Sequence, residues 1–400
     1  MECDIDRRFL DASKLLASVR DIIDERVRGG ALPSWCARRE WVNWLAALSD
    51  DQVRAIERDG LFAQLDRLSS VPEDLAILTR EAARCVSLPV MSPSTSANVD
   101  THRTPPRKRE QVASFASLVE RLPRRPQRIV DIGSGHGHLT RHLARALGVP
   151  AEGWERDPAR VAVAASLTSY DGPRFVTIDA RTVGTSLSRN DLVVGLHACG
   201  ELGDHSVRAA SEARASVAII GCCLQKRVGD RDALSVPAGI EPSSLCIGRA
   251  ELGLGNACDG EEGVEADLDT RIRSRVNRAA LRAILRGCGH DVRPGQEMRG
   301  VNRRRATGTL SDLVLRVFES RGLIPPSSET IDEADRVARA DYAGTSRWTI
   351  PRTMLARLIE VWVALDRAAF LRANGYDAEV LIAFGADVSP RNIAILATPG

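Results

Sequence analysis

The N-terminal segment has apolar residues at helical spacing. Over residues 4–28 they recur every three or four positions, and a Gly-Gly pair ends the pattern. This spacing predicts an amphipathic helix that stops at the glycines. Three tryptophans, Trp35, Trp41 and Trp44, follow at short intervals. We interpret them as anchors of helix packing, because large aromatic side chains are usually buried.

A stretch rich in proline, serine and threonine at 89–106 indicates a linker, and beyond it short apolar strands alternate with helices. The predicted strands are 127–132, 151–155, 174–178, 191–196 and 217–222. The predicted helices between them are 138–147, 158–168 and 204–214. This alternation predicts a mostly parallel sheet, which binds its ligand at the carboxyl ends of its strands.

The C-terminal part of the chain completes the pattern. Helices are predicted at 268–286 and 354–373, and two late strands, 379–384 and 392–397, are expected to close the sheet. The predicted fold is α/β, Rossmann-like, and preceded by an all-helical N-terminal region. The predicted domains are 1–95 (helical N-terminal domain), 96–228 (cofactor-binding core), 229–310 (substrate-side insertion with an Arg-rich helix) and 311–400 (C-terminal helices and closing strands).

The composition narrows the class of protein. Of the 400 residues, 44% are hydrophobic and 27% are charged, and the net charge of +2 creates no global field toward nucleic acid or membrane. No stretch approaches the ~18 apolar residues of a membrane span. The acids in the first residues, MECDIDRRFL, predict no secretory signal. Nine cysteines, an odd number without framework spacing, predict reduced thiols and a cytoplasmic location.

A glycine-rich turn follows the first predicted strand. Gly133, Gly135 and Gly137 have the spacing G-x-G-x-G, and His138 stands where a dinucleotide-binding fingerprint requires a third glycine or alanine. The next helix begins here and offers unpaired N–H groups to a ligand. Asp131 lies two residues before the first glycine, where its carboxylate would repel a pyrophosphate but could hold an ammonium group. This favours S-adenosylmethionine, which has an amino-acid tail.

Two further acids end the next two strands. Glu155 ends the second strand and could accept hydrogen bonds from both hydroxyls of a ribose, in NAD as well as in S-adenosylmethionine. Asp179 follows the third strand and could face an adenine amino group. Alternatively, both acids only cap the helices or turns that follow.

The fourth and fifth strands end in His197-Ala198-Cys199-Gly200 and in Cys222-Cys223. Three interpretations stay open. These residues could shape the wall of the pocket, His197 could act as a general base or bind substrate, or the His and Cys side chains could bind zinc. Adjacent cysteines are awkward joint ligands, so we expect no metal. His197 and Cys199 are the candidate catalytic residues.

The glycine turn and the strand-end acids together resemble the class I S-adenosylmethionine-dependent methyltransferases. The resemblance implies that fold, and it implies cofactor contacts from a set of eight residues. They are Asp131, Gly133, Ser134, Gly135, Gly137, Glu155, Asp179 and His197.

A narrower resemblance covers most of the chain. The segments VDIGSGHGHLTRHLA, GLHACGELGD, IIGCC, VWVALDRAAFLRANGY and SPRNIAILA are similar to those of the methyltransferase-like protein 25 family, which has a Methyltransf_32-type domain. The HACG and CC segments are also similar to those of tRNA 2′-O-methyltransferases, so RNA is a candidate methyl acceptor.

Arginines at helical spacing in the Arg-rich segment suit either a solvated helix face or a surface for phosphates. They are Arg271, Arg275, Arg278, Arg282 and Arg286. Arg391 and Asn392 either border the substrate pocket or hold a turn. Two alternative functions are a module that binds S-adenosylmethionine without turnover and an NAD(P)-dependent Rossmann enzyme.

Overall fold

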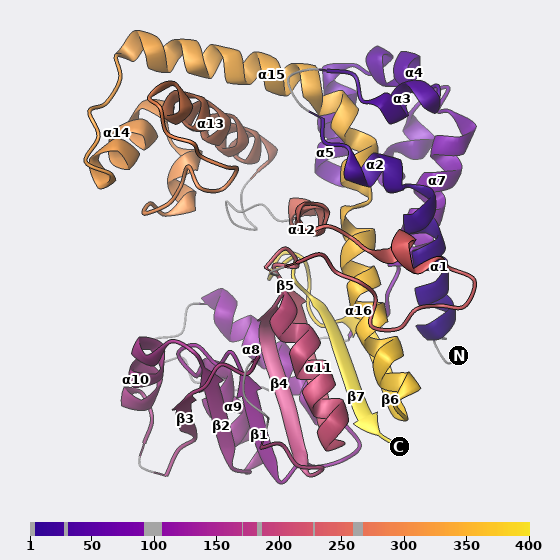
Figure 1. Cartoon of the computed structure of the whole chain (residues 1–400), viewed down its shortest axis with the longest axis vertical. Helices are drawn as coiled ribbons and strands as arrows, with labels where there is room; N and C mark the ends of the chain where they lie inside the picture. The colour runs from indigo at the N-terminus through magenta and orange to yellow at the C-terminus, as the bar shows by residue number, and fades with distance from the viewer. Residues whose placement is uncertain are drawn as a thin grey trace. The chain divides into compact units, whose positions relative to one another are not determined.

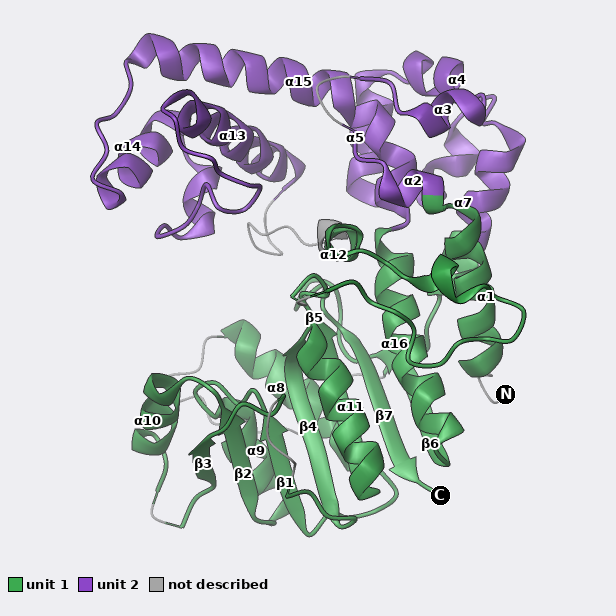
Figure 2. Cartoon of the chain, in the orientation of Figure 1, with its two compact units in different colours: residues 1–20, 82–256, 356–400 green, residues 21–81, 257–355 purple. Residues whose placement is uncertain are grey.

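The computed structural model describes residues 5–27, 31–91, 106–169, 171–181, 186–226, 229–258 and 267–400. The chain divides into two compact units, each built from segments that are distant in the sequence (Figure 2). Unit 1 comprises residues 1–20, 82–256 and 356–400, and unit 2 comprises 21–81 and 257–355. The helical N-terminal segment therefore contributes to both units.

Unit 1 is built on a seven-stranded sheet with the order β3-β2-β1-β4-β5-β7-β6 (Figure 1). The strands are β1 (Arg128–Ile132), β2 (Ala151–Glu155), β3 (Arg174–Thr177), β4 (Asp191–Cys199), β5 (Ser216–Cys222), β6 (Tyr376–Ile382) and β7 (Ile393–Pro399). Only β7 runs antiparallel to its neighbours, β5 and β6. The predicted α/β fold with a mostly parallel, Rossmann-like sheet is confirmed.

Helices cover both faces of this sheet. On one face, α8 (Pro106–Glu120) and α9 (His138–Leu147) pack on the apolar side chains of the central strands. On the other face, α11 (Glu201–Ala213) packs on β4 and β5, whose remaining side chains are also buried, and α16 (Ala356–Ala373) packs on β6 and β7. Burial on both faces explains why β4 and β5 are nearly all apolar.

Three further helices lie within unit 1. Helix α10 (Pro158–Ser166) packs on β2 and β3, and α1 (Ile5–Ser18) packs on α16. The ring centroids of Phe9 and Trp362 in the α1–α16 contact are 6.3 Å apart. The short α12 (Arg249–Leu252) lies in the segment that follows β5.

Unit 2 is helical. Its N-terminal helices are α2 (Arg20–Asp24), α3 (Ser34–Arg38), α4 (Val42–Ala47), α5 (Asp50–Asp59), α6 (Leu61–Gln64) and α7 (Glu73–Val86), of which α2 and α7 cross a unit boundary. Trp35 and Trp41 are fully buried with their rings edge to face, 6.0 Å between centroids, which is the packing role predicted for them. Trp44 donates a hydrogen bond from its indole to the carbonyl of Ser69.

The second part of unit 2 has its own core, formed by α13 (Leu268–Gly287), α14 (Leu310–Ser320) and α15 (Ser328–Met354). Three of the five arginines predicted as a stripe on α13 form ion pairs inside the unit. Arg278 and Arg282 both form ion pairs with Glu297, which is fully buried, and Arg275 pairs with Glu57. These arginines serve packing within the helical unit.

The predicted and observed elements differ in informative places. The helix predicted over 4–28 is interrupted, since α1 ends at Ser18 and α2 ends at Asp24. The strand predicted at 191–196 continues to Cys199, and α14 and α15 were not predicted as separate helices. Most of the predicted linker at 89–106 lies outside the described residues. Among the helices described, none combines the length and apolar character needed to cross a bilayer.

Candidate functional site

The glycine turn after β1 requires glycine for backbone reasons. Gly133, Gly135 and Gly137 have φ values of +74°, +57° and +71°, in the region that side chains disfavour. A Cβ on Gly137 would also lie 2.2 Å from Cζ of Phe175. The turn can therefore pack directly on β3 and bring backbone N–H groups close to a ligand.

Asp131, the predicted partner of an amino-acid ammonium, lies beneath this turn. Its side chain is 2% exposed, and its Oδ2 accepts a hydrogen bond from the Thr140 hydroxyl at 2.6 Å. Burial raises the pKa of Asp131 to about 6, although the Thr140 hydrogen bond and the charge of Lys108 oppose that rise. Asp131 thus ties β1 to α9 from inside.

A cavity of about 300 Å³ opens at the carboxyl ends of β1, β2 and β4 and beside the residues that follow β3. Predicted site residues among its lining are Gly133, Glu155, Asp179, His197 and Cys199. The sequence reasoning missed other lining residues, among them Arg160, Ile178, Arg181, Leu202 and Lys226. Asp131, Ser134, Gly135 and Gly137 contribute to the turn and are not among the lining residues.

Glu155 joins the turn to the second strand. Its carboxylate accepts hydrogen bonds from the N–H of Gly135 to Oε2 and from the N–H of Asp157 to Oε1, both at 3.1 Å. Arg160 lies 3.9 Å from Oε2. The Glu155 side chain is 7% exposed and lies at the edge of the cavity. Backbone N–H groups therefore replace part of the water that would otherwise bind its carboxylate.

Asp179 also borders the cavity, and it is engaged with Arg181. The guanidinium of Arg181 donates to both carboxylate oxygens, at 2.9 Å from Nε and 2.5 Å from Nη2, and the Arg181 N–H donates as well. These hydrogen bonds lower the pKa of Asp179 to about 2, despite some opposing burial. The carboxylate is therefore ionised over the whole physiological range.

His197 sits in a β-bulge of β4. The register between β4 and β5 shifts by one residue between Leu196 and Ala198, and His197 has φ +78°. Its Nε2 lies 3.1 Å from Oε1 of Gln111 on α8. An oxygen acceptor there implies that Nε2 carries the proton and leaves Nδ1 with a lone pair.

Burial lowers the pKa of His197 to about 4, and the positive charge of Lys108 contributes. The imidazole is therefore neutral near pH 7. Gln111 could not be identified from the sequence, because it comes from α8, a helix that precedes the glycine turn.

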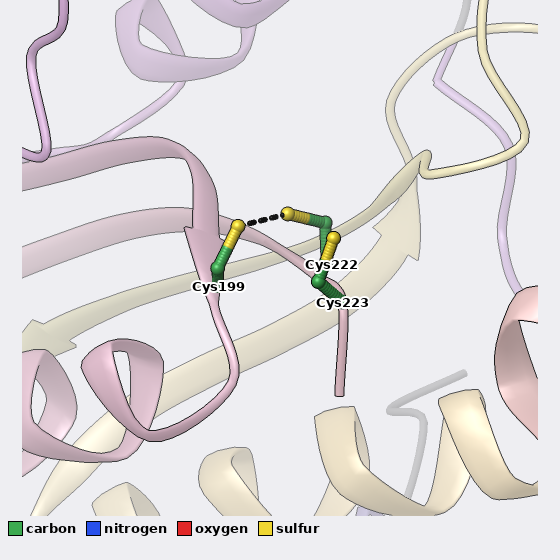
Figure 3. A group of neighbouring side chains, drawn as sticks. All are labelled: Cys199, Cys222 and Cys223. Carbon is green, nitrogen blue, oxygen red and sulfur yellow. Dashed lines mark hydrogen bonds between the residues drawn. The ribbon is translucent and has the colours of Figure 1, made fainter. Parts of the chain in front are cut away.

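Three cysteines meet where β4 and β5 end. Cys199, Cys222 and Cys223 have their sulfur atoms within 4.8 Å of one another, and Sγ of Cys199 lies 2.6 Å from Sγ of Cys222 (Figure 3). Cys222 is buried, while Cys199 and Cys223 are half-buried. Cys199 reaches the cavity wall, so the cluster adjoins the site.

Arg391 and Asn392, the candidates at the pocket rim, are both buried and lie outside the cavity lining. Arg391 donates to the carbonyl of Gly255 and pairs with Glu360 at 3.2 Å. Asn392 accepts from Arg357 at 2.7 Å and donates to the Phe384 carbonyl. Both side chains hold backbone around β7.

Residues 107–229 match the family model of a methyltransferase domain. The match covers less than a third of the chain. The matched segment contains the glycine turn, the strand-end acids, His197 and the three cysteines. The two closing strands lie beyond it.

Solved structures give partial similarities. A TehB-like SAM-dependent methyltransferase from Corynebacterium glutamicum is 21% identical over 26% of this chain and 60% of its own, with a TM-score of 0.23. The SAM-bound amino pentose methyltransferase CalS10 from Micromonospora echinaspora is 22% identical over 28% and 50%, with a TM-score of 0.25. A tRNA (uracil-54, C5)-methyltransferase from Pyrococcus abyssi is 20% identical over 29% of each chain, with a TM-score of 0.23. The match spans at most 60% of the length of these proteins.

Proposed function

We propose that this chain is an S-adenosylmethionine-dependent methyltransferase that binds its methyl donor in the cavity at the ends of β1 and β2. The observation that carries the proposal is the position of Glu155. Its buried carboxylate borders the cavity and contacts the glycine turn through Gly135. A carboxylate at this end of the second strand accepts hydrogen bonds from ribose hydroxyls.

The residues around Glu155 fit the rest of that cofactor. The two backbone N–H groups that Glu155 accepts leave lone pairs for the ribose, since a carboxylate offers about four acceptor positions. The hydroxyl of Ser134 is buried, has no hydrogen-bond partner among the described residues and lies outside the cavity lining, so a contact with the ligand would require this side chain to rotate. When bound, S-adenosylmethionine supplies a methyl group activated on a sulfonium.

Asp131 and Asp179 have supporting roles in this proposal. Asp131 is too enclosed to contact the amino-acid tail directly, and it holds the turn in position through Thr140. Asp179 borders the cavity with its charge fixed by Arg181. Because a carboxylate offers about four acceptor positions, Asp179 can also accept from the amino group of an adenine.

His197 is the proposed proton acceptor. It lines the cavity, it is neutral near pH 7, and its Nε2–H is held by Gln111. The lone pair on Nδ1 can accept a hydrogen bond from the acceptor group and orient it, which is how a positioned imidazole assists proton transfer. A low pKa limits its strength as a base, so positioning would be its larger contribution.

The resemblance to the methyltransferase-like protein 25 family agrees with the methyltransferase domain and extends the comparison to segments that the family model does not cover. RNA stays a prediction for the acceptor. It rests mainly on the HACG and CC segments, because three of the five stripe arginines of α13 are engaged in ion pairs within unit 2.

Calorimetric titration of the full chain with S-adenosylhomocysteine and with NADH tests the donor site. We expect S-adenosylhomocysteine to bind, and Glu155→Gln to weaken it about tenfold or more, because a charged hydrogen bond contributes about 1.5–3 kcal/mol. The matched control is Glu212→Gln, a substitution on α11 away from the cavity lining, which should leave the affinity unchanged. Binding of NADH with no response to S-adenosylhomocysteine would support the dehydrogenase alternative.

Turnover is tested separately, by incubating the chain and a labelled methyl donor with fractionated cell extract. Label in RNA, protein or a small molecule identifies the acceptor class. Binding of the donor with no transfer to any fraction would support the non-catalytic module instead.

A further inference from the structure

Three thiols from two strands converge at the site, although neighbouring positions of a strand normally point to opposite faces. The sequence therefore argues against Cys222 and Cys223 as joint ligands. In the structure both sulfur atoms lie on the same side, facing Cys199 (Figure 3). Two irregularities of the backbone bring this about.

The first irregularity is the bulge at His197. Before it, Leu196 pairs with Ile220, and after it, Cys199 pairs with Cys222. If the register set by Leu196 and Ile220 continued unbroken, Cys199 would pair with position 223. The bulge therefore sets Cys199 beside Cys222 on the neighbouring strand, and paired residues of parallel strands point to the same face.

The second irregularity is at Cys223, which has φ +45°. A non-glycine residue in the left-handed region is uncommon, because its side chain crowds the backbone there. The reversal turns the Cys223 side chain back toward Cys199 and Cys222. Such strain clusters at functional sites, where the surrounding structure maintains it.

Positive charges surround the cluster. Lys226 lies within electrostatic range of Cys199 and Cys223, Arg391 of Cys223, and Lys108 of Cys222. Three thiolates with one divalent cation carry a net charge of −1, which these cations can offset. Metals bind cysteine as the thiolate, and these nearby cations would offset the charge of the metal-bound cluster.

We propose that Cys199, Cys222 and Cys223 bind one zinc ion, with the fourth coordination position open toward the cavity. Thiolates are preferred ligands of zinc, and three protein ligands with one open position are typical of its catalytic sites. No fourth Cys, His, Asp or Glu joins the group among the residues that the structure describes. Water would therefore complete the coordination.

The sulfur positions require a small adjustment. Around a zinc ion with bonds of about 2.3 Å, two sulfur atoms lie roughly 3.8 Å apart. Cys199 and Cys222 would have to separate by about 1 Å from their contact at 2.6 Å. Small rotations of the two side chains provide this movement without a change in the strands.

The test is a metal titration of the full chain, purified with a phosphine reductant and stripped with a chelator. Co²⁺ is the probe, because thiolate coordination gives a charge-transfer band in the near ultraviolet, and Zn²⁺ should then displace it. We expect one equivalent of Co²⁺ to bind, and Cys199→Ser, Cys222→Ser and Cys223→Ser each to lower the affinity at least tenfold. Cys246→Ser, a cysteine of unit 1 outside the cluster, is the matched control and should bind normally.

Circular dichroism establishes that each variant is folded, and the half-buried Cys223 provides a readable variant if Cys222→Ser fails to fold. A folded chain with no charge-transfer band, or a band that survives all three substitutions, would overturn the proposal. So would a Cys199–Cys222 disulfide that persists under the reductant, detected by peptide mass spectrometry. The experiment measures metal binding alone. A failure of the zinc proposal can therefore be distinguished from a failure of the donor site to bind S-adenosylhomocysteine.

Discussion

Single residues around the site adopt conformations that the rest of unit 1 must maintain. His197 and Cys223 lie in the left-handed region, at φ +78° and +45°. Asp131 is a carboxyl enclosed by β1 and α9. None of these states is favourable for an isolated residue, and each borders the glycine turn or the cysteine cluster.

Asp131 gives a pH-dependent stability that can be measured. Its pKa is about 6 in the folded chain and near 3.8 in the unfolded chain, because burial disfavours the charged form. The folded state therefore binds the proton more tightly, and stability is lost as the pH rises through this interval. Relative to Asp131→Asn, the wild type should lose on the order of 3 kcal/mol between about pH 4 and pH 7.

Urea unfolding of both proteins at several pH values provides the measurement. The difference between the two profiles isolates Asp131, because every other titrating group is common to both. Parallel profiles would mean that the carboxyl is solvated in the folded chain.

At the scale of elements, the ends of β4 and β5 are shaped by α11 and α16. Arg367 on α16 donates from Nε to Asp204 and from Nη2 to the carbonyl of Gly200, which follows β4 directly. Its guanidinium lies close to Gly203 on α11, where a side chain has no space. The backbone after Cys199 is thus held by a buried arginine that lies outside the cavity lining.

Gly203→Ala tests this packing, because the sign of the change in the free energy of unfolding shows whether a side chain fits at this position. Alanine normally stabilises a helix relative to glycine by about 1 kcal/mol. Here the new Cβ would lie 2.6 Å from Nη2 of Arg367, which its buried hydrogen bonds hold in place, so we expect a loss of about 1–3 kcal/mol. Denaturant unfolding measures the change.

Gly287→Ala is the matched control, because Gly287 is also helical and a Cβ added there would have no neighbouring atom within 4 Å. The free energy of unfolding of the Gly287→Ala variant should change by less than about 1 kcal/mol. A stabilising effect at Gly203 equal to that at Gly287 would show that Arg367 moves aside freely.

At the scale of the whole molecule, unit 1 is assembled from three separate stretches of chain, and a buried ion network joins two of them. Arg231 pairs with Asp366 at 2.6 Å and with Asp204 at 3.2 Å, and its guanidinium stacks over Trp362. Asp366 also accepts the N–H groups of Leu234 and Ser235. The segment after β5 is thereby attached to α11 and α16.

Arg231→Met should destabilise unit 1 by about 3–5 kcal/mol, because it leaves Asp366 buried without its cation. The matched control is Arg121→Met, which removes an exposed pair with Glu379 and should cost less than about 1 kcal/mol. Thermal or denaturant unfolding of both variants gives the comparison. Equal small effects would show that the network does not hold the segment in place.

Much of the sheet was predictable because its signals are local. Helix α9 begins at His138 and ends at Leu147, as its glycine-bounded pattern predicts, and β2 also has its predicted bounds. The strand at 191–199 was predicted too short. His197 and Cys199 are polar positions beyond its apolar run, and a bulge leaves no mark in hydrophobic periodicity.

The candidate site was predictable only in its backbone elements. Glycines at fixed spacing and acids at strand ends can be recognised in the sequence as candidate site residues, because the α/β fold brings the strand ends to one edge of the sheet. The partners of those residues could not be read in this way. Gln111 beside His197, Arg181 on Asp179, and Arg367 beneath the turn after β4 depend on how helices and loops pack.

The sequence by itself determined the strands, the glycine turn and the acids that border it, since each follows from residue spacing and backbone preference along a short stretch. Only the tertiary structure decided that Asp131 is enclosed, that His197 is neutral and that three cysteines face one another. Those properties depend on burial, strand register and charges contributed by distant segments. Local sequence does not encode the distances between such groups, and the folded chain does.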